Sequence, residues 1–124
     1  MTGPEKIEWT PSQDFLEEFR RLRQKQQEER RQRKKDAFVR AEMVAEFMKE
    51  KWGVTRVYLY GSLAWGDFHE RSDIDLFVEG FKGDYWRMLV EVEEIAGPFP
   101  VSVVCAEDAF LSLKKRVLEE GVAL

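Results

Sequence analysis

The chain of 124 residues has a single cysteine and no long apolar run. Because Cys105 has no second cysteine to pair with, no disulfide can form within the chain, which is typical of a reducing, intracellular compartment. Cys105 lies in the apolar stretch VSVVCA, so we expect a buried thiol rather than a nucleophile. No stretch approaches the length of a membrane span, and the N-terminus MTGPEKIEWT has no signal-peptide core. These absences predict a soluble, cytoplasmic protein with no membrane partner.

A long helix is predicted from Pro11 to Trp52. In the segment TPSQ, Thr10 can cap the helix, Pro11 suits the first helical position, and Gln13 can complete a capping box. Gly53 is placed to end the helix. Such a helix would be about 60 Å long at ~1.5 Å per residue, whereas the rest of the domain should be only about 30 Å across.

Apolar side chains are absent from Arg23 to Asp36, in the middle of this predicted helix. Nothing in the segment can be buried against an apolar core. We therefore expect it to project into solvent, bend, or pack on another chain, and not to pack on its own domain. If the apolar patches on either side of it pair between chains, the protein would form a homo-oligomer through the N-terminal helix.

Charge is divided unevenly along the chain, whose net charge is −4. Residues 1–40 hold 11 Lys and Arg against 8 Asp and Glu, whereas residues 41–124 hold 9 against 16. The run at 20–35, RRLRQKQQEERRQRKK, can contact nucleic-acid phosphates, but it lacks the interleaved aromatics of a single-strand binder. We favour a solvated helix or a protein contact over nucleic acid. The chain is therefore divided into a charged helical extension, 1–36, and a domain, 37–124.

Strands and helices alternate in the remaining sequence. Strands are expected at 54–60, 74–80 and 99–106, and helices at 84–97 and 107–120. Asp84 is the expected cap of the first of these helices, and Gly97 and Gly121 are the expected stops. The order predicts an α/β or α+β domain in which helices flank a small mixed sheet.

Two aspartates stand at the start of the strand predicted at 74–80. Side chains alternate along a strand, so Asp73 and Asp75 point to the same face, with Cα atoms about 7 Å apart. Two carboxylates there repel each other and are costly to desolvate. A divalent cation removes both costs, and Mg²⁺ prefers one or two carboxylates together with water and phosphate oxygens. The pair therefore predicts a divalent metal site.

A Gly-Ser turn precedes these aspartates, where the first strand ends. Gly61 lets the backbone approach a ligand closely, and Ser62 offers a hydroxyl beside free backbone N–H groups, which suits a phosphate. Taken singly, a Gly-Ser turn or an Asp-x-Asp strand end is usually structural, but their combination between two strands is far more specific. A phosphate turn beside a carboxylate metal site predicts binding of a nucleoside triphosphate with Mg²⁺.

The segment GSLAWGDFHERSDID resembles the signature of the nucleotidyltransferase superfamily that includes DNA polymerase β: Gly-Ser, ten residues, Asp-x-Asp. The short chain and the segments GSLAWG, SDIDLFVEG and LEEGVAL resemble the minimal nucleotidyltransferases, which are often antitoxins encoded beside a HEPN-domain toxin. The resemblance covers about residues 40–124 and implies the nucleotidyltransferase fold.

The resemblance also implies a reaction. Gly61 and Ser62 would bind the triphosphate, and Asp73 and Asp75 would hold Mg²⁺ or Mn²⁺. A nucleoside monophosphate would pass from NTP, with ATP the first candidate, to an acceptor hydroxyl, with release of pyrophosphate. In the toxin–antitoxin members the acceptor is a tyrosine of the toxin, so a HEPN-domain toxin is an expected partner.

One position departs from the family pattern. The family carries a third carboxylate on a later strand, and in PVSVVCAED that position is Ser102, which cannot bind the catalytic metal or activate a hydroxyl as a carboxylate does. Glu107 or Asp108 could substitute if the loop bends back. Three functions stay open: an active nucleotidyltransferase, a catalytically degenerate module that binds nucleotide or protein as an antitoxin or scaffold, and a nucleic-acid-associated protein acting through its basic helix.

Overall fold

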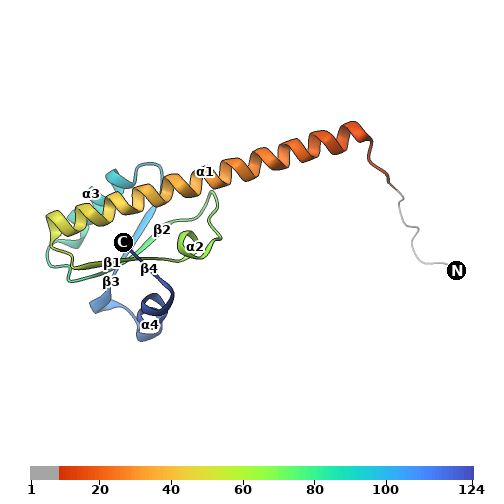
Figure 1. The fold of residues 1–124 in the computed structure, drawn as a ribbon. Coiled ribbons are helices and arrows are strands. Elements are labelled where there is room, and N and C mark those ends of the chain that lie inside the picture. The colour runs from red at the N-terminus through yellow and green to blue at the C-terminus, as the bar shows by residue number, and fades with distance from the viewer. Residues whose placement is uncertain (1–8) are drawn as a thin grey trace.

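The computed structural model describes residues 9–124 and contains one four-stranded sheet flanked by helices (Figure 1). The elements follow in the order α1 (Gln13–Trp52), β1 (Arg56–Tyr60), α2 (Ser62–Trp65), β2 (Ile74–Glu79), α3 (Tyr85–Ala96), β3 (Val101–Cys105), the 3-10 turn η1 (Ala106–Asp108), α4 (Leu111–Glu120) and β4 (Val122–Ala123). The strand order is β3-β2-β1-β4. β1 is antiparallel to β2 and β4, and β2 is parallel to β3. The predicted mixed sheet and α+β class are confirmed.

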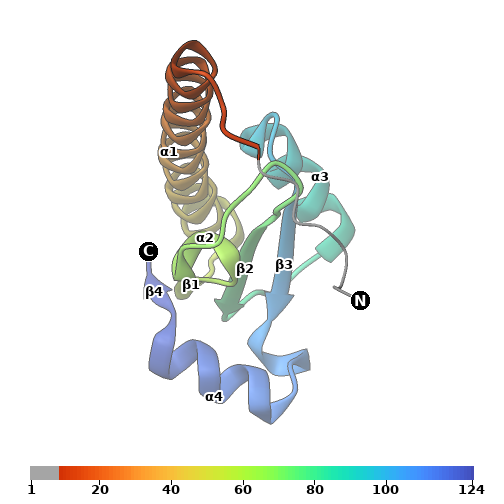
Figure 2. The same ribbon diagram turned by 90° about the vertical axis from the view of Figure 1, so that its right-hand side faces the viewer.

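Helices cover both faces of the sheet, α1 and α3 on one side and α4 on the other (Figure 2). β2 serves both layers because its side chains alternate. Ile74, Leu76 and Val78 are buried in the core under α1 and α3. Phe77 points the other way and is buried with Val117 of α4. Asp75 and Glu79 alternate with these three, so they share the face of Phe77.

The first helix ends as predicted but begins later than predicted. Gly53 ends it in a left-handed conformation, with φ +67°. The cap is Ser12 rather than Thr10, because the Ser12 side chain accepts a hydrogen bond from the Phe15 amide at 3.2 Å. Pro11 therefore lies outside the helix. Thr10 and Ser12 both carry a hydroxyl that can cap a helix, and the backbone geometry places Ser12 at the cap.

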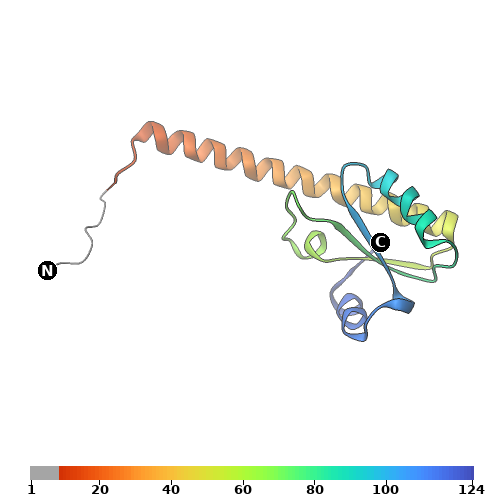
Figure 3. The ribbon, with the colours of Figure 1, turned by 180° about the vertical axis from the view of Figure 1, so that it is seen from behind.

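Roughly the second half of α1 packs on the domain, while the rest projects beyond it (Figures 1 and 3). Its buried residues begin at Ala37 and recur with helical spacing as far as Met48. The projection is as expected from the absence of apolar residues at 23–36. The division into 1–36 and 37–124 stays a prediction.

The expectation that 23–36 makes no contact with its own domain is wrong at Arg33. The Arg33 guanidinium donates to the Glu70 carbonyl at 3.2 Å and lies 5.1 Å from the centre of the Phe99 ring. Sequence reasoning treated the segment as unable to pack because it lacks apolar side chains. A planar guanidinium can nevertheless lie against an aromatic ring, so a charged residue can make this contact.

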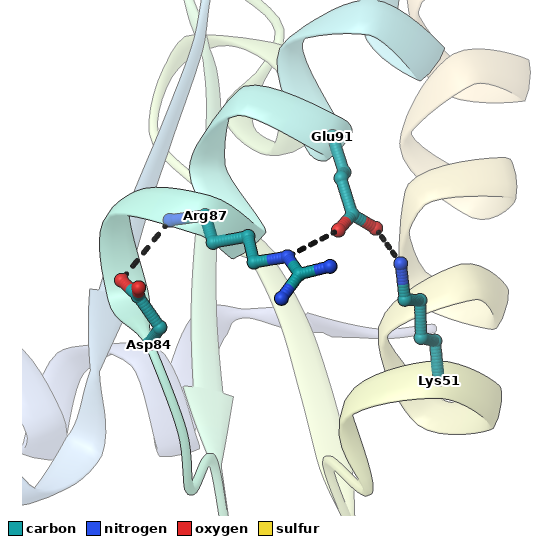
Figure 4. A network of polar contacts seen from close by, with 4 residues as sticks. All are labelled: Lys51, Asp84, Arg87 and Glu91. Atoms are coloured by element: carbon teal, nitrogen blue, oxygen red, sulfur yellow. Dashed lines mark hydrogen bonds and ion pairs between the residues drawn. The ribbon is translucent and has the colours of Figure 1, made fainter.

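A polar network ties the end of α1 to α3 (Figure 4). Glu91 of α3 contacts Lys51 of α1 at 2.5 Å and Arg87 of its own helix at 3.8 Å. Asp84 caps α3 as predicted, because its carboxylate accepts from the Arg87 amide at 3.2 Å. Gly97 ends the helix, also as predicted.

The C-terminal region differs from the predicted helix at 107–120. Residues 106–108 form a 3-10 turn, and α4 begins only at Leu111 and ends before Gly121, as predicted. β4, which pairs with Tyr58 and Leu59 of β1, was not predicted. A strand of two residues has no periodicity to detect, so its pairing with β1 is seen only in the folded structure.

Among residues 9–124, every helix is too short or too polar to cross a lipid bilayer.

Candidate functional site

A row of three side chains crosses the sheet on the face of α4. Tyr60 of β1 pairs with Asp75 of β2, and Asp75 pairs in turn with Ser102 of β3. Directly paired residues on neighbouring strands share a face and lie about 4.8 Å apart. Asp73 precedes Asp75 by two residues, immediately before β2 begins. The fold therefore brings Ser102 beside Asp75.

The glycine turn abuts this row. Gly61 has φ +74°, and a Cβ placed there would lie 2.3 Å from Oδ2 of Asp75. No side chain fits between them, so Gly61 is required both by backbone conformation and by the close approach of the carboxylate. Ser62 follows as the first residue of α2, and its carbonyl accepts from the amides of Gly66 and Asp67. The predicted phosphate turn and the predicted metal ligand are thus adjacent.

Burial perturbs the carboxyl group at the centre of the row. Desolvation, with a further contribution from the negative charge of Asp73, raises the pKa of Asp75 to about 6. The pKa of Tyr60 is also raised, by burial and then by Asp75. Both shifts have the same main cause, because burial disfavours the charged form of each group. A divalent cation at Asp73 and Asp75 would favour the ionised carboxylate.

Neither acidic residue after β3 reaches this site. The Glu107 carboxylate accepts from the Gly80 amide at 3.1 Å, and such backbone hydrogen bonds lower its pKa. Gly80 lies five residues beyond Asp75, about 16 Å away at the rise of a strand. Asp108 belongs to the same turn as Glu107. The alternative in which either residue replaces the third carboxylate is therefore not supported.

The same conclusion follows from the arrangement of all metal-binding side chains. Within the described chain, 9–124, no three His, Cys, Asp or Glu side chains are grouped so that they could hold one metal ion. The candidate donor set is the pair Asp73 and Asp75, and Ser102 occupies the place beside them.

Comparison with known proteins adds the family. Residues 41–124 match the sequence profile of the family described as "Nucleotidyltransferase domain". The chain belongs to this family. It is 38% identical over 76 residues to a Methanocaldococcus jannaschii protein provisionally named protein adenylyltransferase, a match that spans 58% of this chain and 81% of that protein. A solved structure provisionally described as a minimal nucleotidyltransferase covers 69% of this chain and 90% of its own, with a TM-score of 0.59 and 30% identity.

Membership confirms the resemblance seen in GSLAWGDFHERSDID, and the general chemistry of a nucleotidyltransferase is transfer of a nucleoside monophosphate. The matched segment, 41–124, includes both the glycine turn and the aspartates. It begins after Arg33, so the projecting part of α1 lies outside the match.

Sequence reasoning missed a cation beside the site. Arg116 of α4 lies 4.0 Å from the ring centre of Trp65, whose Nε1 donates to the Glu120 carbonyl at 3.1 Å. The Trp65 ring is in turn 6.5 Å from that of Tyr60. No local pattern links α2 to α4, so only the folded nucleotidyltransferase domain shows that Arg116 borders the Tyr60 end of the row.

Proposed function

We propose that this nucleotidyltransferase binds a nucleoside triphosphate, ATP in the first instance, with Mg²⁺ and transfers the nucleoside monophosphate to a hydroxyl group of a partner protein. The observation that carries the proposal is the contact between Gly61 and Asp75, which sets a phosphate turn against a carboxylate. The M. jannaschii relative, named for protein adenylylation, supports ATP as the nucleotide and a protein as the acceptor.

The residues present fit a divalent cation. Asp73 and Asp75 offer oxygen ligands of the kind that Mg²⁺ and Mn²⁺ prefer. Burial and the neighbouring charge of Asp73 raise the pKa of Asp75, and a divalent cation would offset both effects. When bound, the metal would neutralise the triphosphate and stabilise charge on the departing pyrophosphate. Asp73 and Asp75 would hold the metal together with phosphate oxygens and water, because Mg²⁺ is usually bound by only one or two carboxylates.

The chain's own residues would bind and orient the nucleotide. Gly61 lets the backbone of the turn lie against Asp75, and Ser62 adds a hydroxyl at the start of α2. Ser102 stands where a third carboxylate would assist removal of the acceptor proton, and its neutral hydroxyl is a poor base. We therefore expect the protein to bind nucleotide but to transfer it slowly.

A second function is favoured by Ser102 itself. A degenerate member would retain nucleotide binding and act as an antitoxin or scaffold by docking on its partner. For either function the proposed partner is a HEPN-domain toxin, whose tyrosine would supply the hydroxyl group in the active case. An adjacent reading frame encoding such a toxin would support this partner, and its absence from the gene neighbourhood would count against it.

Self-association through α1 is a separate proposal. Phe15, Phe19 and Leu22 are about half exposed on the projecting part of α1, and Trp9 packs edge-on against Phe15 with ring centres 5.4 Å apart. Exposed apolar clusters on a protein surface often mark interaction sites. We therefore propose that this cluster pairs with the same cluster on a second copy of the chain. Light scattering should report a dimer, and Phe15→Ser/Phe19→Ser should give a monomer. A monomeric wild type at high concentration contradicts the pairing.

Calorimetry with ATP tests the nucleotide site. Wild type should bind ATP with Mg²⁺ and lose most of that affinity with EDTA, and Asp73→Asn/Asp75→Asn should not bind. Glu107→Gln is the matched control, because it removes a carboxylate at the other end of β2 and should leave binding intact. Equal binding by wild type and the double variant would refute the metal site. Transfer is then measured with labelled ATP and the candidate partner.

A further inference from the structure

Arg33 joins the projecting helix to two loops of the domain. Its guanidinium carbon lies 5.1 Å from the centre of the Phe99 ring and 6.0 Å from that of Phe68. These two rings pack on each other, 6.2 Å apart, and both are buried. An Nη of Arg33 also donates to the Glu70 carbonyl at 3.2 Å. One side chain of α1 thus holds both the α2–β2 loop and the start of β3.

The α2–β2 loop connects the two halves of the candidate site. It begins after α2, whose first residue is Ser62, and it ends at Asp73. Local hydrogen bonds order the end of the loop that is next to Asp73. The His69 amide donates to the Ser72 hydroxyl at 3.0 Å, and the Ser72 amide donates to the His69 carbonyl at 3.0 Å. Ser72 is buried although it is polar. A shift of this loop would move Asp73 directly.

The Phe99 segment reaches the same aspartates from the other side. Pro100, next to Phe99, accepts a hydrogen bond from the Ile74 amide at 2.8 Å. Ile74 stands between Asp73 and Asp75, and Ser102 follows two residues after Pro100. Arg33 therefore contacts both segments that flank Asp73 and Asp75: the α2–β2 loop and the segment that precedes β3.

We infer that Arg33 is a positioning residue, which locks the α2–β2 loop and thereby fixes Asp73 and Asp75 relative to the glycine turn. The inference rests on the proposed nucleotide site for its functional consequence, but the lock itself is a property of the free chain. It assigns a role in the site to a residue outside the segment, 41–124, that matches the family. The role needs arginine because the planar group contacts two rings while donating to a carbonyl, which lysine cannot reproduce.

Arg33→Met is a suitable test because it keeps the apolar stem and removes the guanidinium. In the described part of the chain, Nε of Arg33 is buried without a hydrogen-bond partner, so the substitution also removes a costly orphaned donor and should not unfold the protein. Arg40→Met is the matched control. Arg40 also lies on α1 and donates to a backbone carbonyl, that of Ile95 at 3.0 Å, and this hydrogen bond joins α1 to α3 rather than to the α2–β2 loop.

The first measurement is hydrogen exchange in the free protein, resolved at the amides of His69 and Ser72. The second is the dissociation constant for ATP with Mg²⁺. We expect Arg33→Met to speed exchange at these amides about tenfold or more and to weaken ATP binding about tenfold, with Arg33→Lys between it and wild type. Arg40→Met should leave both quantities near their wild-type values.

Either of two results in Arg33→Met would overturn the inference: unchanged exchange, or faster exchange with unchanged ATP binding. An equal loss of binding in Arg40→Met would also overturn it, because the effect would then reflect general destabilisation. If wild type binds no ATP, the proposed function fails and with it the functional consequence. The exchange rates still decide whether Arg33 locks the loop.

Discussion

Replacing Asp75 by asparagine should stabilise the metal-free protein while destroying its proposed site. Burial and Asp73 raise the pKa of the Asp75 carboxyl from 3.8 to about 6, so the ionised group is less stable in the folded protein than in the unfolded chain. Asparagine has nearly the same shape and no charge. The substitution therefore removes the free-energy cost of a buried negative charge, which the wild-type protein carries when no metal is bound.

The size of the penalty follows from the pKa. The rise in the pKa of Asp75 from 3.8 to about 6 corresponds to a loss of at most ~3 kcal/mol in the free energy of unfolding. Because the carboxyl is only half buried, solvent screening reduces this to about 1–2 kcal/mol. The folded state holds its proton more tightly, so this group's contribution to stability is greatest below about pH 4 and declines as the pH rises through 6. The advantage of asparagine should accordingly be absent near pH 4 and complete above about pH 7.

Urea unfolding at several pH values, without metal or nucleotide, measures the effect. Glu79→Gln controls for the change in net charge, because Glu79 lies on the same face of β2 at its other end. Adding ATP with Mg²⁺ at 100 times its dissociation constant should then stabilise wild type by ~2.7 kcal/mol and leave Asp75→Asn unchanged. The reasoning is refuted if Asp75→Asn is less stable than wild type at pH 8, or if its advantage does not depend on pH.

Two further substitutions test the site from other directions. Gly61→Ala places a Cβ 2.3 Å from Oδ2 of Asp75 at φ +74°, so it should abolish ATP binding, whereas Gly53→Ala meets no atom within 4 Å at φ +67° and should cost only ~1 kcal/mol of stability. Retained binding in Gly61→Ala would show that the close approach is not required. Ser102→Asp restores a carboxylate beside Asp75 and should raise nucleotide transfer to a partner by about 10²–10³, measured with labelled ATP. Efficient transfer by wild type, with no gain in this variant, would mean that two carboxylates suffice.

The candidate site could be proposed from sequence because its parts are local, and its role stays a prediction. Gly61 follows a β-rich run, and Asp73 and Asp75 are separated by one residue, so alternation along a strand already places both carboxylates on one face. The family signature then links the two motifs across ten residues. Caps such as Asp84 and stops such as Gly53 and Gly97 were also predicted correctly, because each depends on one residue's backbone preference or hydrogen bond.

Two features depended on contacts between residues distant in sequence, and only the tertiary structure decided them. Glu107 follows β3 closely enough to suggest a third metal ligand, but the parallel pairing of β2 and β3 carries it to the far end of the strand. Arg33 belongs to a run that reads as solvated, yet it meets Phe99 because the helix crosses that loop. Alternation within an element is set by the chain itself, whereas the neighbour of a charged side chain is set by how the elements pack.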